Sequence, residues 1–554
     1  MTALLVVIVT ALVVIAASAV LGPRLGIASP LVLVAIGVGA SFLPLVGTVE
    51  IEPEWILQGV LPPLLYSSAV SMPAMNFRRE FGAISGLSVL LVIGTSLVLG
   101  LFFLLVLPDL GFAWGVALGA IVSPTDAVAT SIVKGTTVSR RVVAMLDGES
   151  LLNDATALVL LRTAIAAAAA GFSLWGAVGS FAYSVAVAVA IGALAGWLNL
   201  AVRRRLSDPT VNTILSFTVP FLASVPAELL GGSGLVAAVV AGVVTGIRAP
   251  RELSPQNRLS DSQNWRTVEL VLEGAVFLTM GLQVRAIVTS VEEDHAGVGP
   301  AVLVAAGALL LTILVRAAYV APLLGVLAGR SRLRERMRPR VEDLHERMNT
   351  PEGRQETLES QRGRARSARD LDRFSVRLTR ILADMEYFVR APLGWREGAA
   401  VVWAGMRGAV TVAAAQTLPE GTPQRSVLVL VAFAVATMSL ALQGGTIGPL
   451  LRRIAPPVDR EALARDADEE RSRVFALLKT SAEAIEEPPP ATEERGTAAF
   501  EAARRHRLAV IAAQRSALLD ARDDGTFDAD VLESVLAALD ASQIDIELRG
   551  RAAR

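Results

Sequence analysis

The residues with the clearest chemical potential lie in one short stretch, Gly148-Glu149-Ser150-Leu151-Leu152-Asn153-Asp154, at the start of a long apolar segment. At 100° per residue of an α-helix, Glu149, Ser150, Asn153 and Asp154 fall within about 140° of one another. They therefore share one polar face. Carboxylate, amide and hydroxyl oxygens suit a small hard cation better than nitrogen or sulfur does. The stretch predicts a cation site on one helix face.

A carboxylate on such a face can also carry a proton. Desolvation disfavours the charged form of the carboxylate, so a proton and a metal cation compete for it. The chain has three histidines, His295, His345 and His506, and all of them lie in polar stretches. Protons that cross a membrane on this chain must then be carried by carboxylates. This competition is sufficient for cation/proton exchange.

Two other segments combine a helix breaker with a charge inside an apolar run. Ser123-Pro124-Thr125-Asp126 interrupts residues 112–133, and Gly405-Met406-Arg407-Gly408 interrupts residues 400–417. Proline removes a backbone hydrogen bond, and each segment alone could be a simple kink. Together, in the fifth and twelfth of the predicted membrane spans, they run in opposite directions and carry opposite charges. This pattern predicts an inverted-repeat transporter with two crossing broken helices.

The elements that must position these groups are membrane-spanning helices. Of 554 residues, 53% are hydrophobic and 19% charged, and outside residues 327–396 and 452–554 only 38 charged side chains occur in 381 residues. We predict an all-α polytopic membrane protein with about 13 spans of about 20 residues each. The predicted spans are residues 2–21, 28–46, 56–74, 83–107, 112–133, 150–170, 174–201, 209–227, 232–248, 267–288, 300–326, 400–417 and 426–450.

The loop charges predict the orientation. Short cytoplasmic loops collect lysine and arginine. The loops on one side contain thirteen basic residues, whereas those on the other side contain only Arg425. We therefore expect the N-terminus outside and the C-terminus in the cytoplasm. The first span has no basic region before it, which disfavours a cleaved signal peptide.

Two charged regions fall on the predicted cytoplasmic side. Residues 1–452 form the predicted transmembrane domain, interrupted by an insertion at 327–396 with 17 basic and 11 acidic side chains. Residues 453–554 form a helical C-terminal region, and from 452 the tail carries 16 basic and 21 acidic side chains. The insertion is either a solvated helical connector or a segment for regulation or contact with anionic lipid. The two opposite charges could attract each other.

The chain resembles the monovalent cation/proton antiporters of the NhaP and eukaryotic sodium/proton-exchanger type. The resemblance covers residues 1–452 apart from the insertion, and the stretches that carry it occur in the family's order. The Glu-Ser-Leu-Leu-Asn-Asp block with Thr-Asp before it is specific, whereas the others are short. The matching stretches are 61–66 (LPPLLY), 123–129 (SPTDAVA), 148–159 (GESLLNDATALV), 403–410 (WAGMRGAV) and 443–451 (QGGTIGPLL).

The resemblance implies roles for individual residues. Asp154 is similar to the family's essential ion-binding and proton-carrying carboxylate. Asn153 before it is similar to the asparagine of an Asn-Asp pair that accompanies electroneutral exchange. Glu149, Ser150 and Thr125 are similar to further cation contacts.

Four more positions are carried over as supporting residues. Asp126 is similar to the carboxylate that neutralises helix ends at the crossing, and Arg407 to the arginine that holds the site's asparagine and carboxylates. Glu273 and Arg316, in the tenth and eleventh spans, resemble a structural ion pair. Glu269 lies close enough to a span end for its charge to reach water.

We therefore expect a secondary transporter, not an enzyme, that exchanges Na⁺ for protons, with K⁺ or Li⁺ as the alternative cations. Proton flux measured against cation concentration is the best test. The resemblance implies a homodimer in a bacterial plasma membrane. We expect no cofactor and no nucleic-acid partner. A cation channel is the alternative, but the chain lacks a Thr-Val-Gly-Tyr-Gly filter. An ATP-driven pump would need a phosphate-binding loop, and neither of the two lysines lies in one.

Overall fold

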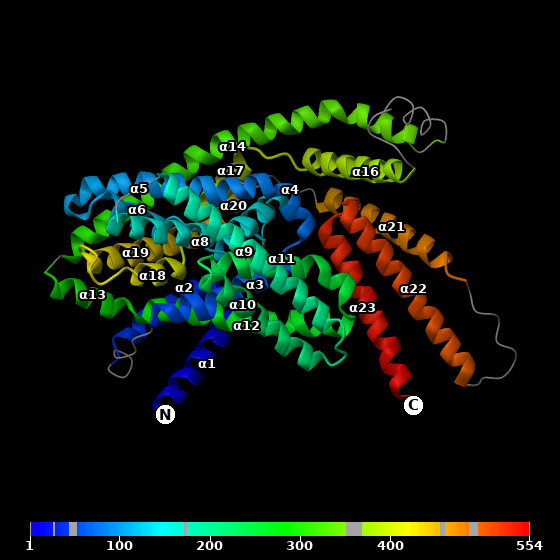
Figure 1. Cartoon of the computed structure of the whole chain (residues 1–554), viewed down its shortest axis with the longest axis horizontal. Coiled ribbons are helices and arrows are strands. Elements are labelled where there is room, and N and C mark those ends of the chain that lie inside the picture. The colour runs from blue at the N-terminus through cyan, green and yellow to red at the C-terminus, as the bar shows by residue number, and fades with distance from the viewer. Residues whose placement is uncertain are drawn as a thin grey trace. The chain divides into compact units, whose positions relative to one another are not determined.

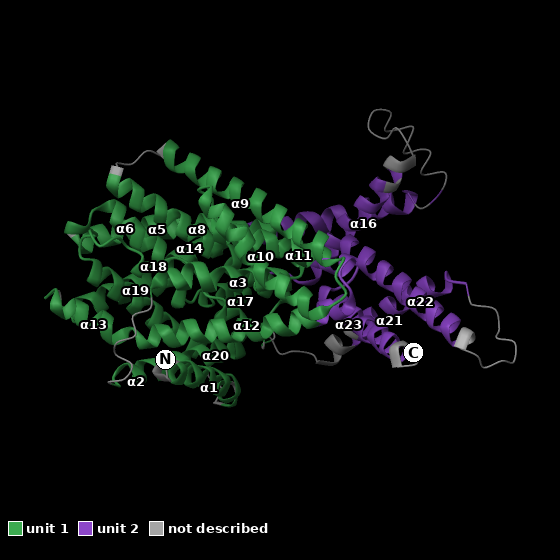
Figure 2. Ribbon diagram, turned by 60° about the horizontal axis from the view of Figure 1, so that its bottom comes forward, with its two compact units in different colours: residues 1–248, 260–324, 395–455 green, residues 249–259, 325–394, 456–554 purple. Residues whose placement is uncertain are grey.

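The computed structural model describes residues 2–25, 28–43, 52–134, 136, 138–170, 174–295, 297–348, 350, 368–454, 460–486 and 497–552. Every regular element in these ranges is a helix (Figure 1). The predicted all-α class is confirmed. The chain forms two compact units, coloured separately in Figure 2. Unit 1 comprises residues 1–248, 260–324 and 395–455, and unit 2 comprises residues 249–259, 325–394 and 456–554.

Unit 1 contains the apolar helices. Several of them are interrupted by short π-helical turns, as at Trp55–Val60, Gly86–Leu91 and Leu440–Gly444. The helices that lie in it wholly or in part are α1 (Thr2–Leu25), α2 (Ser29–Ser41), α3 (Leu61–Ser71), α4 (Ala74–Ser85), α5 (Val92–Val106), α6 (Phe112–Val122), α7 (Val128–Lys134), α8 (Arg140–Ala170), α9 (Leu174–Arg203), α10 (Pro209–Leu229), α11 (Gly234–Glu252), α12 (Pro255–Leu282), α13 (Val284–Glu293), α14 (Val298–Met348), α17 (Trp395–Trp403), α18 (Ala409–Gln416), α19 (Arg425–Ser439) and α20 (Gly445–Ile454).

Within the described ranges, nine helical stretches are long and apolar enough to cross a membrane. They coincide with nine of the thirteen predicted spans. Two further spans fall on the shorter apolar helices α2 and α6. The last two, residues 56–74 and 400–417, fall on interrupted helices. The multi-pass architecture is confirmed, and the number of thirteen crossings stays a prediction.

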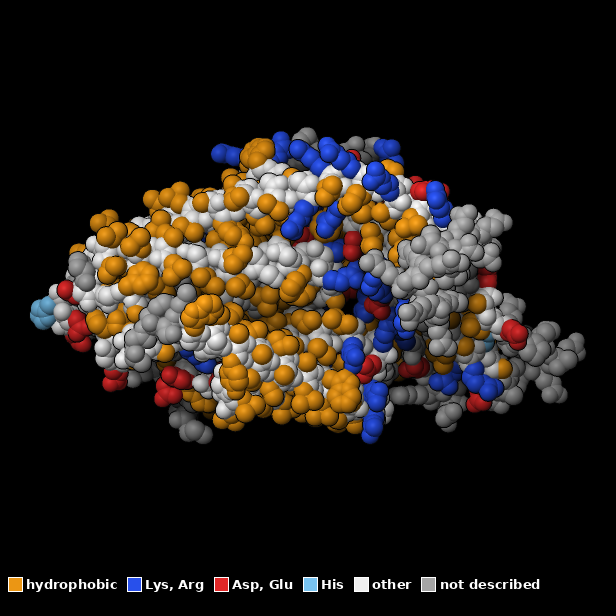
Figure 3. Space-filling view, turned by 45° about the horizontal axis from the view of Figure 1, so that its top comes forward, with side chains coloured by type: hydrophobic (Ala, Val, Ile, Leu, Met, Phe, Trp, Pro, Cys, Tyr) orange, Lys and Arg blue, Asp and Glu red, His pale blue; other side chains and the backbone are white. Residues whose placement is uncertain are grey.

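The surface of unit 1 is suited to lipid. Large apolar side chains stand exposed on its helices, for example Leu105 on α5 and Trp175 and Leu194 on α9. Figure 3 shows hydrophobic side chains gathered over one face of the molecule. A soluble protein rarely exposes so much contiguous apolar surface. Helices satisfy their own backbone hydrogen bonds, which is what a hydrocarbon environment requires.

Unit 2 combines the insertion with the C-terminal tail. Its own helices are α16 (Ala368–Arg390), α21 (Arg460–Glu483), α22 (Thr497–Asp524) and α23 (Ala529–Ala552). Val474, Leu478, Leu518 and Leu532 form a buried core between the tail helices. The insertion contacts the tail where Arg380 Nε lies 3.1 Å from Asp524 Oδ1. This ion pair agrees with the opposite net charges of the two regions.

Residues 249–259, which join α11 to α12, also belong to unit 2. Arg251 lies 2.8 Å from a carboxylate oxygen of Asp520 and 2.7 Å from one of Asp523. Arg258 pairs with Asp540, which also accepts a hydrogen bond from Arg515 at 2.8 Å. The tail is therefore tied by ion pairs to the last turn of α11 and the first turn of α12.

Candidate functional site

Two broken helices meet in the interior of unit 1. The backbone leaves helical geometry between α6 and α7, at residues 123–127, and between α17 and α18, at residues 404–408. The Asp126 N–H donates a hydrogen bond to the Met406 carbonyl oxygen at 2.7 Å, which joins the two unwound segments directly. The predicted pair of crossing broken helices is confirmed. Pro124, which has no N–H, explains the first break in the sequence.

The second break depends on a glycine. A Cβ placed on Gly408 would overlap the carboxylate of Asp126. Gly408 therefore lets the start of α18 approach the first unwound segment closely. The Asp126 carboxylate therefore lies at the N-terminal end of α18. It also lies at the N-terminal end of α7, where it accepts a hydrogen bond from Val128 N–H at 2.9 Å.

Opposite charges lie at opposite ends of the half-helices. The buried Arg407 guanidinium donates to the carbonyl oxygens of Val122 at 3.0 Å and Ser123 at 3.4 Å, where α6 ends, and also to that of Gly405. Helix C-termini carry partial negative charge and N-termini partial positive charge. Arg407 and Asp126 thus neutralise the ends that the breaks expose.

Arg407 differs from its expected role in one respect. The sequence resemblance implied that it holds the site's asparagine and carboxylates. The hydrogen bonds of its guanidinium go instead to backbone carbonyls. Its backbone N–H donates to Ser439 Oγ at 3.0 Å. Ser439 in turn donates to Gln443 at 2.6 Å, and Gln443 Nε2 donates to the Trp403 carbonyl oxygen at 3.1 Å, where α17 ends.

Helix α8 supports the first unwound segment from one side. Asn153 Nδ2 donates to the Thr125 carbonyl oxygen at 2.9 Å and to its hydroxyl at 2.7 Å. The Thr125 hydroxyl donates to Glu149 Oε1 at 3.1 Å. All three side chains are buried. Asn153 therefore holds Thr125 in position through its Nδ2 group.

The predicted ion pair between Glu273 and Arg316 is wrong. Arg316 Nη2 lies 2.8 Å from Glu149 Oε2, and its Nη1 contacts Glu149 Oε1, so the pair is bidentate. Arg316 Nε donates to the Val401 carbonyl oxygen at 2.9 Å. The sequence offered no means to choose between Glu273 and Glu149, because the partner of Arg316 is decided by how α14 packs against α8.

A cavity of about 110 Å³ lies beside the crossing, and we call it the site cavity. Its apolar walls come from residues such as Leu61, Leu65 and Phe277. Its lining, all within the described part of the chain, includes four carboxylates and no basic side chain. The polar lining residues are Ser68, Thr125, Asp126, Ser150, Asp154, Glu269, Glu273 and Thr411.

Three of the predicted cation contacts line the site cavity, and one does not. Asp154, Thr125 and Ser150 are present, together with Asp126. Glu149 is absent from the lining and has both carboxylate oxygens engaged by Arg316. The structure therefore gives Glu149 an ion pair with Arg316 outside this cavity, and its contact with the cation stays a prediction. The Ser150 hydroxyl donates to the Asp147 carbonyl oxygen at 3.0 Å and keeps lone pairs for a ligand.

Sequence reasoning missed two carboxylates of this cavity. Glu273 was assigned to an ion pair and Glu269 to a position near the membrane surface, yet both line the site cavity from α12. Their spacing of four residues was the available signal, because it puts two carboxylates on one face of a helix.

The sequence model of the family described as "Sodium/hydrogen exchanger, transmembrane" matches residues 8–341 and 373–453. The unmatched residues between these ranges fall inside the predicted insertion. An uncharacterized Na⁺/H⁺ exchanger of Mycobacterium tuberculosis is 27% identical over 98% of this chain and 96% of its own length.

Two further relatives are similar to parts of the chain or to its fold. A sodium, potassium, lithium and rubidium/H⁺ antiporter of Bacillus subtilis is 31% identical over 48% of this chain and 41% of its own. The solved sodium proton antiporter MjNhaP1 of Methanocaldococcus jannaschii superposes with a TM-score of 0.54 at 15% identity, over 82% of this chain and all of that one. Because the family's sequence model covers well over half of the chain, the protein belongs to the family of transmembrane sodium/hydrogen exchangers.

Proposed function

We propose that this transporter exchanges Na⁺ for protons across the membrane, and that both ions bind in turn to Asp154. The observation that carries the proposal is the charge of the site cavity, which has four carboxylates and no basic side chain in its lining. Asp154 is nine-tenths buried there, with a relative exposure of 9%. An uncompensated buried carboxylate is costly, so a proton or a cation must neutralise it.

The cation's ligands are oxygens from three sides of the site cavity. We propose Asp154 and Ser150 from α8 and Thr125 from the unwound segment before α7, with Asp126 close by. Hard oxygen ligands suit Na⁺, K⁺ and Li⁺ alike. The name of the Bacillus subtilis relative, which includes potassium, supports K⁺/H⁺ exchange by the same residues as the second candidate.

Exchange then follows from competition and alternating access. The site holds either a cation or a proton. Either ion is carried across the membrane when the site, at the point where the broken helices cross, opens first to one side and then to the other. Asn153, which precedes Asp154, is neutral and donates its Nδ2 hydrogens to Thr125, so it adds no second negative charge beside Asp154. With Asp154 as the carboxylate that exchanges its ion, the proposed exchange is one-for-one and electroneutral.

The membrane setting of the proposal rests on the loop charges. Thirteen basic residues in the loops of one side against one on the other support a cytoplasmic C-terminus and an external N-terminus. A bacterial plasma membrane agrees with the bacterial relatives. Assembly as a homodimer is proposed from the family resemblance, and native mass measurement in detergent tests it.

The substitution Asp154→Asn tests the proposal. It keeps the size of the side chain and removes the charge, so we expect Na⁺-dependent proton flux in everted membrane vesicles to fall to background. The matched control is Asp109→Asn, which alters an exposed carboxylate outside the site cavity and should retain wild-type flux. Full activity of Asp154→Asn, at wild-type levels in the membrane, would contradict the proposal.

A further inference from the structure

The two carboxylates that α12 adds to the site cavity have a position that the exchange mechanism above does not use. Glu269 and Glu273 are one helical turn apart, so they lie on one face of α12, about 6 Å apart along its axis. Both line the site cavity with Asp154. Both are half-buried, and Glu269 accepts a hydrogen bond at 3.3 Å from Ser68 Oγ, a neutral group.

A second cavity touches the same helix. It has a volume of about 670 Å³, and we call it the vestibule. Its lining comes from α1, α2, α7, α12 and α20 and includes Ser29, Thr136 and Arg452. Glu273 and Phe277 line the vestibule as well as the site cavity. These two side chains are therefore shared walls between the large cavity and the cavity that holds Asp154.

The vestibule lies toward the arginine-bearing side of unit 1. Thr136 and Arg452 belong to the basic loop after α7 and the basic end of α20. Under the proposed orientation this side faces the cytoplasm. A cation that arrives from the cytoplasm through the vestibule then meets Glu273 before it meets Asp154.

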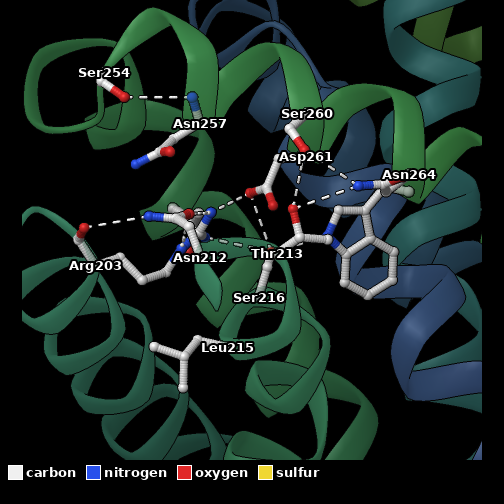
Figure 4. A network of polar contacts seen from close by, with 12 residues as sticks. Arg203, Asn212, Thr213, Leu215, Ser216, Ser254, Asn257, Ser260, Asp261 and Asn264 are labelled. Carbon is white, nitrogen blue, oxygen red and sulfur yellow. Dashed lines mark hydrogen bonds and ion pairs between the residues drawn. The ribbon is translucent and has the colours of Figure 1, made fainter. Parts of the chain in front are cut away.

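The helix that carries the pair is held firmly just before it. Figure 4 shows a network in which the buried Arg203 of α9 pairs with Asp261 of α12 and donates to Asn212 Oδ1 of α10. Trp265 Nε1, one turn before Glu269, donates to Ser216 Oγ of α10 at 2.9 Å. The Trp265 ring packs on Tyr66 of α3 with centroids 5.2 Å apart. These contacts hold the turn of α12 that precedes the two glutamates.

We propose that Glu269 and Glu273 form a transient cation site that loads Asp154 from the vestibule. Two carboxylates one helical turn apart raise the local cation concentration, and an arriving cation relieves their mutual repulsion. Their ligand is a partly hydrated monovalent cation. The unpartnered, buried Asp154 in the same cavity is the next acceptor. This inference rests on the proposed function, because it assumes that Asp154 is the exchange site.

The test compares the apparent KM for Na⁺ at the two faces of the membrane. In the double variant Glu269→Gln, Glu273→Gln, we expect the apparent KM for Na⁺ added at the cytoplasmic face, in everted vesicles, to rise about tenfold or more. The maximal rate should stay near wild type. The KM measured from the external face, in right-side-out vesicles, should not change. The single variant Glu273→Asp keeps the charge, so its cytoplasmic KM for Na⁺ should stay at the wild-type value.

Controls keep this test distinct from that of the proposed function. Glu292→Gln, at an exposed position of α13 outside both cavities, should leave both KM values unchanged. If the double variant does not fold, the single variants Glu269→Gln and Glu273→Gln are measured instead. An unchanged cytoplasmic KM, or an equal rise from both faces, overturns the transient site. Exchange that survives in Asp154→Asn overturns the proposed function instead.

Discussion

At the scale of single residues, the chain divides its buried charges between binding and support. Asp154 faces the site cavity without a basic partner in the lining. Glu149, only five residues earlier on the same helix, is locked to Arg316. The sequence grouped the two on one polar face, whereas in the structure only Asp154 lines the site cavity. It could not predict which of them a distant arginine would take, because that depends on packing between helices far apart in the sequence.

The ion pair between Arg316 and Glu149 predicts how substitutions at these two residues change stability. Arg316→Met leaves Glu149 buried without its partner, and breaking a buried ion pair in this way costs about 3–5 kcal/mol. We expect a clearly lower melting temperature in detergent. Adding Glu149→Gln removes the orphaned charge and should recover most of that stability.

Transport by the double variant decides the role of Glu149. If Glu149 is structural, the folded double variant Arg316→Met, Glu149→Gln keeps measurable Na⁺/H⁺ exchange. A double variant that is as stable as wild type but has no exchange, as expected for Asp154→Asn, would instead make Glu149 a cation ligand.

At the scale of elements, the site is built by backbone that is not helical. Pro124 and the glycines around Arg407 predicted both breaks, because these residues disfavour continuous helix. The direct hydrogen bond between Asp126 N–H and the Met406 carbonyl oxygen could not be predicted. It requires the two segments to cross at one register, which is set by tertiary packing. The contribution of α12 was likewise hidden, since Glu269 and Glu273 lie in a helix with no break.

The close crossing predicts a strong effect of one methyl group. In Gly408→Ala the new Cβ overlaps the Asp126 carboxylate, so α18 or the first unwound segment must move. Overpacking of this kind costs about 1–3 kcal/mol, and we expect exchange to fall at least about tenfold. The melting temperature and the proton flux of the purified protein check both effects.

Gly94→Ala is the matched control for the crossing. A Cβ on Gly94, in α5, meets no atom within 4 Å. Alanine is also the better helix former by about 1 kcal/mol. This variant should therefore be as active and at least as stable as wild type. If both alanine variants behave alike, the crossing does not depend on close approach at Gly408.

At the scale of the whole molecule, the chain is an ion exchanger with a charged second unit. The apolar body, its spans and the opposite net charges of insertion and tail could be read from composition, because hydropathy and charge are local properties. The inclusion of residues 249–259 in unit 2 could not. It depends on contacts such as Arg251 with Asp520, which join positions 269 residues apart.

The central claim is that a proton and a cation share Asp154, and counting protons tests it most directly. Purified protein in weakly buffered detergent is mixed with NaCl, and the protons released per bound Na⁺ are measured with a pH indicator. We predict one proton released per sodium ion bound by the wild-type protein, and none from Asp154→Asn. Sodium binding without proton release, or equal release from Asp154→Asn, would contradict the account.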